Sequence, residues 1–470
     1  MTDTIKTKRG LVIAAPSSGS GKTVVTLGLI RHLSNTRRDV ASAKAGPDYI
    51  DPAFHATAGH AAAGHAAMGG RQCLNLDPWA MRPGTLARTA AALSADTVIC
   101  EGVMGLFDGA FVKAGESGGD GNDGNDGSTA ELSRLTGWPV VLVIDARAQA
   151  ASAAAVLKGF TEFRGDVSVA GVVFNRVGGG RHEEILRRAC SQSVPNIPVL
   201  GCLPRIDGPE GLNLPERHLG LVQAVEHPDL ERFLDTAAGL VAEHLDVDGL
   251  LELARPLKLD GGAGMSTPLP PLGGRIAVAA DEAFAFSYVS VIDAWRDAGS
   301  EIVPFSPLAD ESPDAAADAV YLPGGYPELH AARLAAADNF MAGLRDRAAA
   351  GAVVFGECGG YMVLGRGLTD ADGVRHAMAG LLGLETSFAD RRLHLGYRRV
   401  VGLADSSEFE AGAAFRGHEF HYSATLAEGG DAGPGRPLFR AADAEGNDLG
   451  DVGLAEGRVA GSFIHLIDRE

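Results

Sequence analysis

Residues 11–23 read LVIAAPSSGSGKT, and apolar residues at helical spacing follow them. A strand, a glycine-rich turn, Lys-Thr and a helix come in the order that a phosphate-binding loop requires. Small residues let backbone N–H groups close around an anion, Lys22 can reach the outer phosphates, and the Thr23 hydroxyl can bind Mg2+. The stretch therefore predicts an ATP-type site, formed by Gly19, Ser20, Gly21, Lys22 and Thr23. Pro16 stands where the usual pattern has its first glycine, and an ordinary turn before a helix is the alternative.

A nucleotide bound with Mg2+ also needs carboxylates at the carboxyl ends of neighbouring strands. Asp48, in KAGPDYIDP, follows the second predicted strand, and Glu101, in CEGVMGLFDG, follows the third. We predict that both bind the metal and that Lys44 is a further cation near the phosphates. Loop carboxylates, helix caps and a surface lysine are the alternatives. Asp51 and Asp108 are weaker candidates of the same kind.

Short, continuous apolar runs recur between helical patterns along the whole chain. Such runs are typical of parallel strands buried on both faces, so we expect two α/β domains, each with a mostly parallel sheet flanked by helices. The runs are residues 11–15, 40–44, 97–100, 140–144, 169–174, 199–203, 276–280, 302–304, 320–322 and 353–355. The Gly/Pro-rich stretch 260–274 is predicted to link domains 1–259 and 275–470. Residues 115–127, rich in Gly and Asp, are predicted to form a mobile surface insertion without chemistry.

The last of these runs leads into Gly356-Glu357-Cys358-Gly359-Gly360. A nucleophile on a tight strand-to-helix turn needs small neighbours, because its backbone is strained. Such a turn exposes the sulfur at a helix N-terminus, so we expect a lowered thiol pKa for Cys358. The other cysteines are predicted to be buried and structural; they are Cys73, Cys100, Cys190 and Cys202.

A reactive thiolate also needs an oxyanion hole and a base. Residues 322–327, LPGGYP, follow a predicted strand and offer unobstructed N–H groups, although a simple turn is the alternative. The predicted oxyanion donors are Gly324, Gly325 and Gly359. His465, in GSFIH, is one candidate base, and His418 and His421, in GHEFHYS, are its rivals. His55, His60 and His65 recur every five residues, which matches no single helical face, so no metal site is expected there.

Composition narrows the classes of partner. The chain has 470 residues with 41 basic and 60 acidic side chains, a net charge of −19, which repels nucleic acid and anionic lipid. No apolar run is long enough for a signal peptide or a membrane span, so we expect no membrane association. Five widely spaced cysteines without a CxxC pair indicate neither disulfides nor zinc. A reducing cytoplasm fits this pattern best.

Together the motifs resemble, over nearly the full length, the corrin a,c-diamide synthases, glutamine-dependent enzymes of the cobalamin pathway. The resemblance rests on SSGSGKT, KAGPDYIDPAFH, NLDPWAM, EGVMGLFDG, LPERHLGL, YLPGGYPEL, ECGGYMVL, GHEFHYS and GSFIH. It implies an N-terminal, P-loop NTPase-like domain similar to dethiobiotin synthetase, which forms amides with ATP. It also implies a C-terminal class I glutamine amidotransferase domain.

Matched to the family motifs, the residues acquire roles. The resemblance implies that Cys358 is the glutaminase nucleophile and His465 its base, above the two rival histidines. Asn175, in FNRV, resembles a nucleotide-base contact of dethiobiotin synthetases. Class I amidotransferases commonly carry a Glu two positions after the base, where this chain has Ile467, so a Cys-His dyad is expected.

The implied reaction converts a carboxylate to an acyl phosphate with ATP and Mg2+, and ammonia released from glutamine then displaces phosphate. The implied substrate is hydrogenobyrinate, with cobyrinate as the close alternative, and Arg391 and Arg392 are candidates to line its pocket. A nickel-tetrapyrrole a,c-diamide synthase and a cobyric acid synthase are further alternatives, and the assembly considered is a homodimer. An alternative from another functional class is a partitioning or metallochaperone-like NTPase whose C-terminal half is a non-catalytic binding module. The ECGG turn argues against this alternative.

Overall fold

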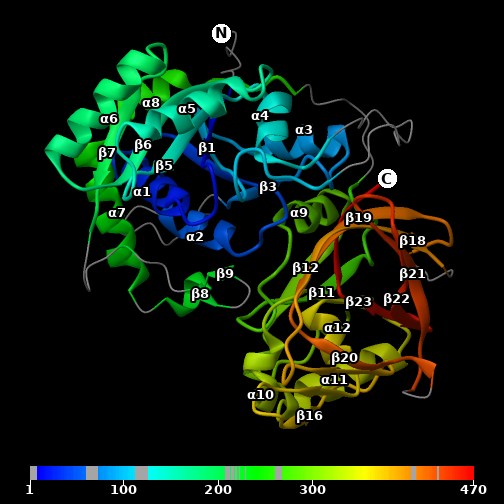
Figure 1. The fold of residues 1–470 in the computed structure, drawn as a ribbon. Coiled ribbons are helices and arrows are strands. Elements are labelled where there is room, and N and C mark those ends of the chain that lie inside the picture. The colour runs from blue at the N-terminus through cyan, green and yellow to red at the C-terminus, as the bar shows by residue number, and fades with distance from the viewer. Residues whose placement is uncertain are drawn as a thin grey trace, which may run out of the picture. The chain divides into compact units, whose positions relative to one another are not determined.

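The chain forms two compact units, shown in the computed structural model of Figure 1. The structure describes residues 8–59, 72–111, 125–206, 212, 216–217, 220–221, 223–227, 229–259, 267–403, 409–430 and 433–470. The first unit takes most of the chain up to Ala263, and the second runs from Gly264 to Glu470 together with the short segments Ala80–Thr85 and Ala110–Glu116. Most of the predicted insertion 115–127, the first half of the 260–274 linker, His60 and His65 lie outside the described residues.

The first unit is built on a parallel sheet with the strand order β3-β2-β4-β1-β5-β6-β7. Its strands are β1 (Arg9–Ala14), β2 (Val40–Ala45), β3 (Leu74–Leu76), β4 (Thr97–Glu101), β5 (Val140–Asp145), β6 (Val169–Val177) and β7 (Val199–Pro204), and β10 (Arg255–Pro256) pairs with β1 in antiparallel fashion. Nearly every residue of β1, β2 and β5 is buried. Burial on both faces is why these strands read as continuous apolar runs, and it confirms the interpretation of the sequence.

Helices flank this sheet (Figure 1). They are α1 (Lys22–Asn35), α2 (Asp51–Ala58), α3 (Pro83–Ala92), α4 (Thr129–Thr136), α5 (Ser152–Glu162), α6 (Gly180–Ser193), α7 (Leu230–His244) and α8 (Val247–Leu253). Helix α1 packs against α7, and α5 packs against α6. Since all the main strands run the same way, the loops after β1, β2 and β4 meet at one edge of the sheet.

The second unit contains a sheet with the order β12-β11-β13-β14-β23-β22-β21-β18-β19-β24. Its strands are β11 (Arg275–Ala279), β12 (Glu301–Phe305), β13 (Ala319–Leu322), β14 (Val353–Glu357), β18 (His394–Gly402), β19 (Ala414–His421), β21 (Arg436–Asp443), β22 (Asp448–Glu456), β23 (Val459–Ser462) and β24 (Ile464–Arg469). Pairing is parallel from β12 to β23 and antiparallel from β23 to β24. The apolar runs predicted the parallel strands of the chain before residue 358 except the short β3, whereas the antiparallel extension is an additional feature.

Helices and a second, small sheet complete this unit. The helices are α9 (Val289–Asp297), α10 (Ala331–Ala335), α11 (Asp338–Ala349) and α12 (Gly359–Leu364), and the small sheet joins β16 (Arg375–Ala377), β15 (Gly367–Thr369), β17 (Leu384–Ser387) and β20 (Ala424–Glu428). A buried core that includes Phe284, Phe340 and Tyr361 packs between these layers. In the part of the chain that the structure describes, no helix combines the length and the apolar character needed to cross a bilayer.

Candidate active sites

The turn between β1 and α1 has the backbone geometry of a phosphate-binding loop. Gly19 and Gly21 adopt φ angles of 76° and 87°, which L side chains rarely tolerate. A methyl group on Gly21 would lie 2.0 Å from Nδ2 of Asn175, and that amide nitrogen donates to the carbonyl oxygen of Ser20 at 3.0 Å. Ser20 Oγ in turn donates to the carbonyl of Ser17 at 2.9 Å. The two glycines are therefore required by the loop, and the Asn175 amide contacts the loop backbone.

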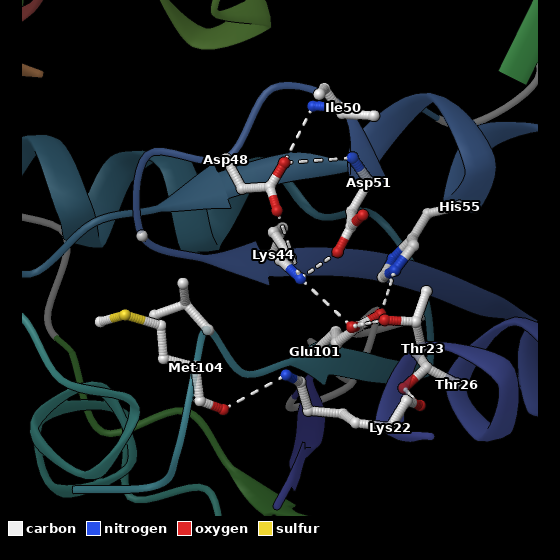
Figure 2. Close-up of polar contacts among 12 residues, drawn as sticks. Lys22, Thr23, Thr26, Lys44, Asp48, Ile50, Asp51, His55, Glu101 and Met104 are labelled. Atoms are coloured by element: carbon white, nitrogen blue, oxygen red, sulfur yellow. Dashed lines mark hydrogen bonds and ion pairs between the residues drawn. The ribbon is translucent and has the colours of Figure 1, made fainter. Parts of the chain in front are cut away.

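Beside this loop, the predicted cations and carboxylates come together (Figure 2). Thr23 Oγ1 donates to Glu101 Oε1 at 2.7 Å, and Lys44 Nζ lies 3.1 Å from the same oxygen. Lys44 also lies 3.6 Å from Asp48 Oδ2 and donates to Asp51 Oδ2. These groups come from α1, β2, the loop after β2, α2 and the end of β4. The structure thus brings together residues that the sequence placed separately after successive strands.

Lys22 lies in the same site and points its ammonium group at the carbonyl oxygen of Met104, 3.3 Å away (Figure 2). Burial and repulsion from Lys44 lower the pKa of Lys22. Burial also opposes the charge of Lys44, but its neighbours Asp51 and Glu101 outweigh this effect and raise the pKa of Lys44. The charge of Lys44 is therefore balanced by neighbouring carboxylates, whereas burial disfavours the charge of Lys22. An anion beside Lys22 would favour its charged form, so the site suits a phosphate group.

Glu101 is fully buried and is the residue on which these contacts converge. Burial would raise its pKa, yet Lys44 and a hydrogen bond with His55 hold the pKa well below its usual range. The Nε2 atom of His55 lies 2.7 Å from Glu101 Oε2, and Cys73 Sγ lies 3.5 Å from the other ring nitrogen. The carboxyl group is thus held ionised inside the protein.

The sequence interpretation gave His55 no role and ranked Asp51 low, yet both belong to this cluster. They are four residues apart on α2 and both are buried, so they share the helix face that packs toward β2. That spacing was a signal in the sequence. Asp108 Oδ2 accepts from the Gly105 amide within its own turn, and the Leu106 amide of that turn donates to the Ala15 carbonyl before the loop.

In the second unit, Cys358 stands between β14 and α12 as a nucleophile on a tight turn. Its φ of 47° and ψ of −103° are strained, and its amide donates to the Ser462 carbonyl at 2.8 Å. A methyl group on Gly360 would lie 1.9 Å from the Leu322 carbonyl oxygen, so the strand-to-helix turn tolerates no larger residue there. The predicted turn geometry is confirmed.

The expected low thiol pKa is wrong. Cys358 is only 1% exposed, and burial raises the pKa of its thiol well above the ordinary value. The Gly359 amide at the start of α12 lowers the thiol pKa, but burial outweighs this effect. The thiol is therefore neutral in this structure, and a base must take its proton when it reacts.

The Cys358 side chain and His465 both flank Gly324. A methyl group there would lie 3.2 Å from Cys358 Cβ, 2.3 Å from His465 Cε1 and 2.8 Å from His465 Nε2. The Gly325 amide nitrogen lies 3.0 Å from where a Gly359 Cβ would stand. The structure thus places the three predicted oxyanion glycines, Gly324, Gly325 and Gly359, around the thiol. Burial, then repulsion from His418, lower the pKa of His465 to about 3, so its ring is neutral and can accept a proton.

The rival histidines lie on β19. His421 Nε2 contacts Glu419 Oε1 at 3.0 Å, and its Nδ1 contacts Ser423 Oγ at 2.9 Å, so both ring nitrogens have partners within their own strand region. His418 is paired across the sheet with His465 itself.

The structure also places the remaining predicted residues. Ile467, two positions after His465, is buried and offers no carboxylate. Arg391 and Arg392 are exposed.

Comparison with known proteins now bears on both units. Residues 11–219 match the CobQ/CobB/MinD/ParA nucleotide binding domain, and residues 275–470 match the CobB/CobQ-like glutamine amidotransferase domain. The hydrogenobyrinate a,c-diamide synthase of Brucella anthropi is 52% identical, with 98% of each chain covered. The chain belongs to the hydrogenobyrinate a,c-diamide synthase family. Enzymes with the same name from Rhizobium meliloti (52% identical, covering 98% of this chain and 99% of that one) and Rhodobacter capsulatus (49% identical, covering 98% of both) agree with this assignment.

Membership of the diamide synthase family confirms the resemblance drawn from the motifs and the two-domain α/β fold. It contradicts the rival interpretation of a partitioning NTPase with a non-catalytic C-terminal half, because the second half matches an amidotransferase domain throughout.

Proposed function

We propose that the chain uses ATP and glutamine to amidate the a and c side-chain carboxylates of hydrogenobyrinate. The observation that carries this proposal is the full-length similarity, at about half identity, to enzymes named for that reaction. The two sites support it, because one combines a phosphate-binding loop with carboxylates and the other combines a thiol with a neutral histidine. ATP, glutamine and the corrin acid are the proposed substrates.

In the first unit, backbone N–H groups of the Gly19–Gly21 turn and the Lys22 ammonium would bind the ATP phosphates. Thr23, Asp48 and Glu101 offer a hydroxyl and two carboxylates, the oxygen ligands that Mg2+ prefers, so they would hold this ion. When bound, the ion would neutralise charge on the transferred phosphoryl group. Lys44, which already lies among the carboxylates, would add positive charge near the phosphates. Asn175 is proposed as a contact of the nucleotide base.

The transfer forms an acyl phosphate from a substrate carboxylate and releases ADP. Ammonia then attacks the acyl carbon, and phosphate leaves as the amide forms. In the second unit, His465 takes the thiol proton of Cys358, and the thiolate attacks the side-chain amide of glutamine. The oxyanion is held by N–H groups around Gly324, Gly325 and Gly359, ammonia departs with the proton from His465, and water releases glutamate from the thioester.

The test separates the two units by nitrogen source. Cys358→Ala should lose glutamine-driven diamide formation but keep ammonia-driven formation near the wild-type rate, because acyl-phosphate capture does not use the thiol. Lys22→Ala should lose both. Mass spectrometry of the corrin product after incubation with each nitrogen source gives the answer. Ammonia-driven synthesis lost in a folded Cys358→Ala protein would contradict this division of the chemistry.

The substrate is tested by offering hydrogenobyrinate and cobyrinate separately and comparing kcat/KM for the diamide. Preference for cobyrinate would select that substrate. Amidation of other side chains would favour a cobyric acid synthase, and amidation of a nickel tetrapyrrole would favour a nickel-tetrapyrrole a,c-diamide synthase.

The proposal includes a homodimer, checked by light scattering, and a linker at residues 260–274. It also includes a cytoplasmic location, where ATP and glutamine are supplied.

A further inference from the structure

Glu357, directly before the nucleophile, carries a carboxylate that the reaction described above does not use. It ends β14 and is only 2% exposed. Its Oε2 accepts a hydrogen bond from the Tyr321 hydroxyl at 2.6 Å, and its Oε1 accepts one from the Leu466 amide at 2.9 Å. A buried carboxyl group with two donors in place has a fixed position.

The Leu466 contact joins β14 to the strand that follows its neighbour β23 in the chain. Leu466 lies on β24, whereas Glu357 lies on β14, and five strands separate these two in the sheet order. The sheet curls so that its far edge returns to β14, and Phe420 of β19 accordingly has its carbonyl oxygen 4.0 Å from the Cys358 sulfur. The hydrogen bond therefore connects Glu357, the residue before the nucleophile, with Leu466, the residue after the base.

The two sides of the His465 ring face different partners. Glu357 Oε2 lies 3.9 Å from Nδ1, while Nε2 is on the side of Gly324 and the Cys358 side chain. A thiol, an imidazole and a carboxylate in this order match the arrangement in which a base takes a proton at one nitrogen and is oriented at the other. The distance of 3.9 Å is longer than a hydrogen bond, as is common for catalytic contacts before substrate binds.

We infer that Glu357 is the positioning carboxylate of the glutaminase, supplied from the strand before the nucleophile in place of an acidic residue at position 467. The inference rests on the proposed glutaminase function and deepens it. When His465 takes the thiol proton, a positive charge appears in a buried site, and Glu357 stabilises that charge and the tautomer with the proton on Nδ1. Glu357 touches neither glutamine nor the thiol; it acts through His465.

The protonation chemistry is compatible with this role. Burial raises the pKa of Glu357 to about 7, against the hydrogen bonds from Tyr321 and Leu466, which favour the charged form. The ionised form is therefore accessible near neutral pH, and a new imidazolium beside it favours ionisation further.

The decisive variant is Glu357→Gln, which keeps the side-chain shape and an acceptor for the Leu466 amide but removes the charge. Glutamate release from glutamine, measured without any corrin, should fall at least about tenfold in kcat, with the glutamine KM within about twofold. Ammonia-driven diamide synthesis should be unchanged. A matched control is Glu428→Gln, since Glu428 also accepts from a buried tyrosine, Tyr361, at 2.6 Å. Glu428 ends β20, which belongs to the small sheet and not to the sheet that contains β14 and β24.

A Glu357→Gln enzyme whose glutaminase kcat stays within about twofold of wild type overturns the inference, because shape alone would then suffice. If that variant loses ammonia-driven synthesis as well and so has not folded, the pair Glu357→Asp and Glu357→Asn replaces it. Equal glutaminase rates in this pair, which differs only in charge, would equally overturn the inference. Since glutamate release needs no corrin, these outcomes are distinct from failure of the proposed diamide synthesis, which would leave glutaminase intact and yield no diamide from either nitrogen source.

Discussion

Replacing Lys44 by methionine tests how much the buried cation at the nucleotide site contributes to the first unit. Lys44 is 2% exposed and lies 3.1 Å from Glu101 and 3.6 Å from Asp48, besides its hydrogen bond to Asp51. Methionine has nearly the same length and fills the space. The change therefore removes the charge and leaves three carboxylates facing one another without their shared cation.

The magnitude follows from these distances. One pair at 3.1 Å is worth about 5 kcal/mol at an effective dielectric constant near 20, before the cost of burying the lysine is subtracted. Removing one partner of a buried pair destabilises proteins by about 3–5 kcal/mol, and we expect that loss at pH 8. Burial and repulsion from Asp48 already raise the pKa of Asp51 to about 6, and loss of Lys44 raises it further. A carboxyl whose pKa is higher in the folded state destabilises that state once it ionises, so the deficit should shrink as the pH falls from 8 to 5.5.

Hydrogen exchange of peptides from β2 and β4 measures the opening free energy of this unit by itself. The control is Lys158→Met on α5, whose ion pair with Glu162 at 3.8 Å is exposed, so a change of about 0.5 kcal/mol or less is expected. A loss below about 1 kcal/mol for Lys44→Met, or one that does not vary with pH, would refute the electrostatic account.

Three further predictions follow from the same geometry. Gly21→Ala should weaken ATP binding in calorimetry more than Gly19→Ala, because both have positive φ but only Gly21 would also collide with Asn175; equal losses would contradict the collision. His421→Ala should keep glutamate release from glutamine, whereas His465→Ala should lose at least about a hundredfold, and the reverse result would mean that the base is misassigned. One ATP site activates one carboxylate at a time, so early time points in mass spectrometry should show a monoamide, and its absence would favour a processive reaction.

Much of the parallel framework could be predicted because strands buried on both faces leave a simple pattern. The run 140–144 became β5 almost residue for residue. The antiparallel strands were harder, because β18 mixes exposed, half-buried and buried residues without regular alternation and includes Arg398 and Arg399, which pair with Glu419 and Glu470. Charged residues that form ion pairs with neighbouring parts of a sheet interrupt the apolar pattern by which a strand is recognised in the sequence.

The site residues divide in the same way. A glycine-rich turn or an ECGG elbow has a local backbone requirement, so Gly21 and Cys358 are visible in the sequence. His55 and Glu357 lie within the motifs KAGPDYIDPAFH and ECGGYMVL, but they act through contacts with residues far along the chain, Glu101 and Leu466, and no local backbone requirement reveals those contacts. The thiol pKa was mispredicted for a related reason: burial depends on what packs around Cys358, and a local turn does not reveal it.

The pairing of β23, near the end of the chain, with β14 has a consequence for folding. Cys358 and His465 are about a hundred residues apart in the chain, and they meet because β23, which ends three residues before His465, pairs in parallel with β14. Pairing over such long separations is slow, because loop closure is unfavourable until the contacts form. A chain that has built β11–β14 already presents the cysteine but not its base, and its thiol has no group to take the proton. Glutamine hydrolysis is therefore gained only when β23 pairs with β14, so a chain that has formed only β11–β14 does not consume glutamine.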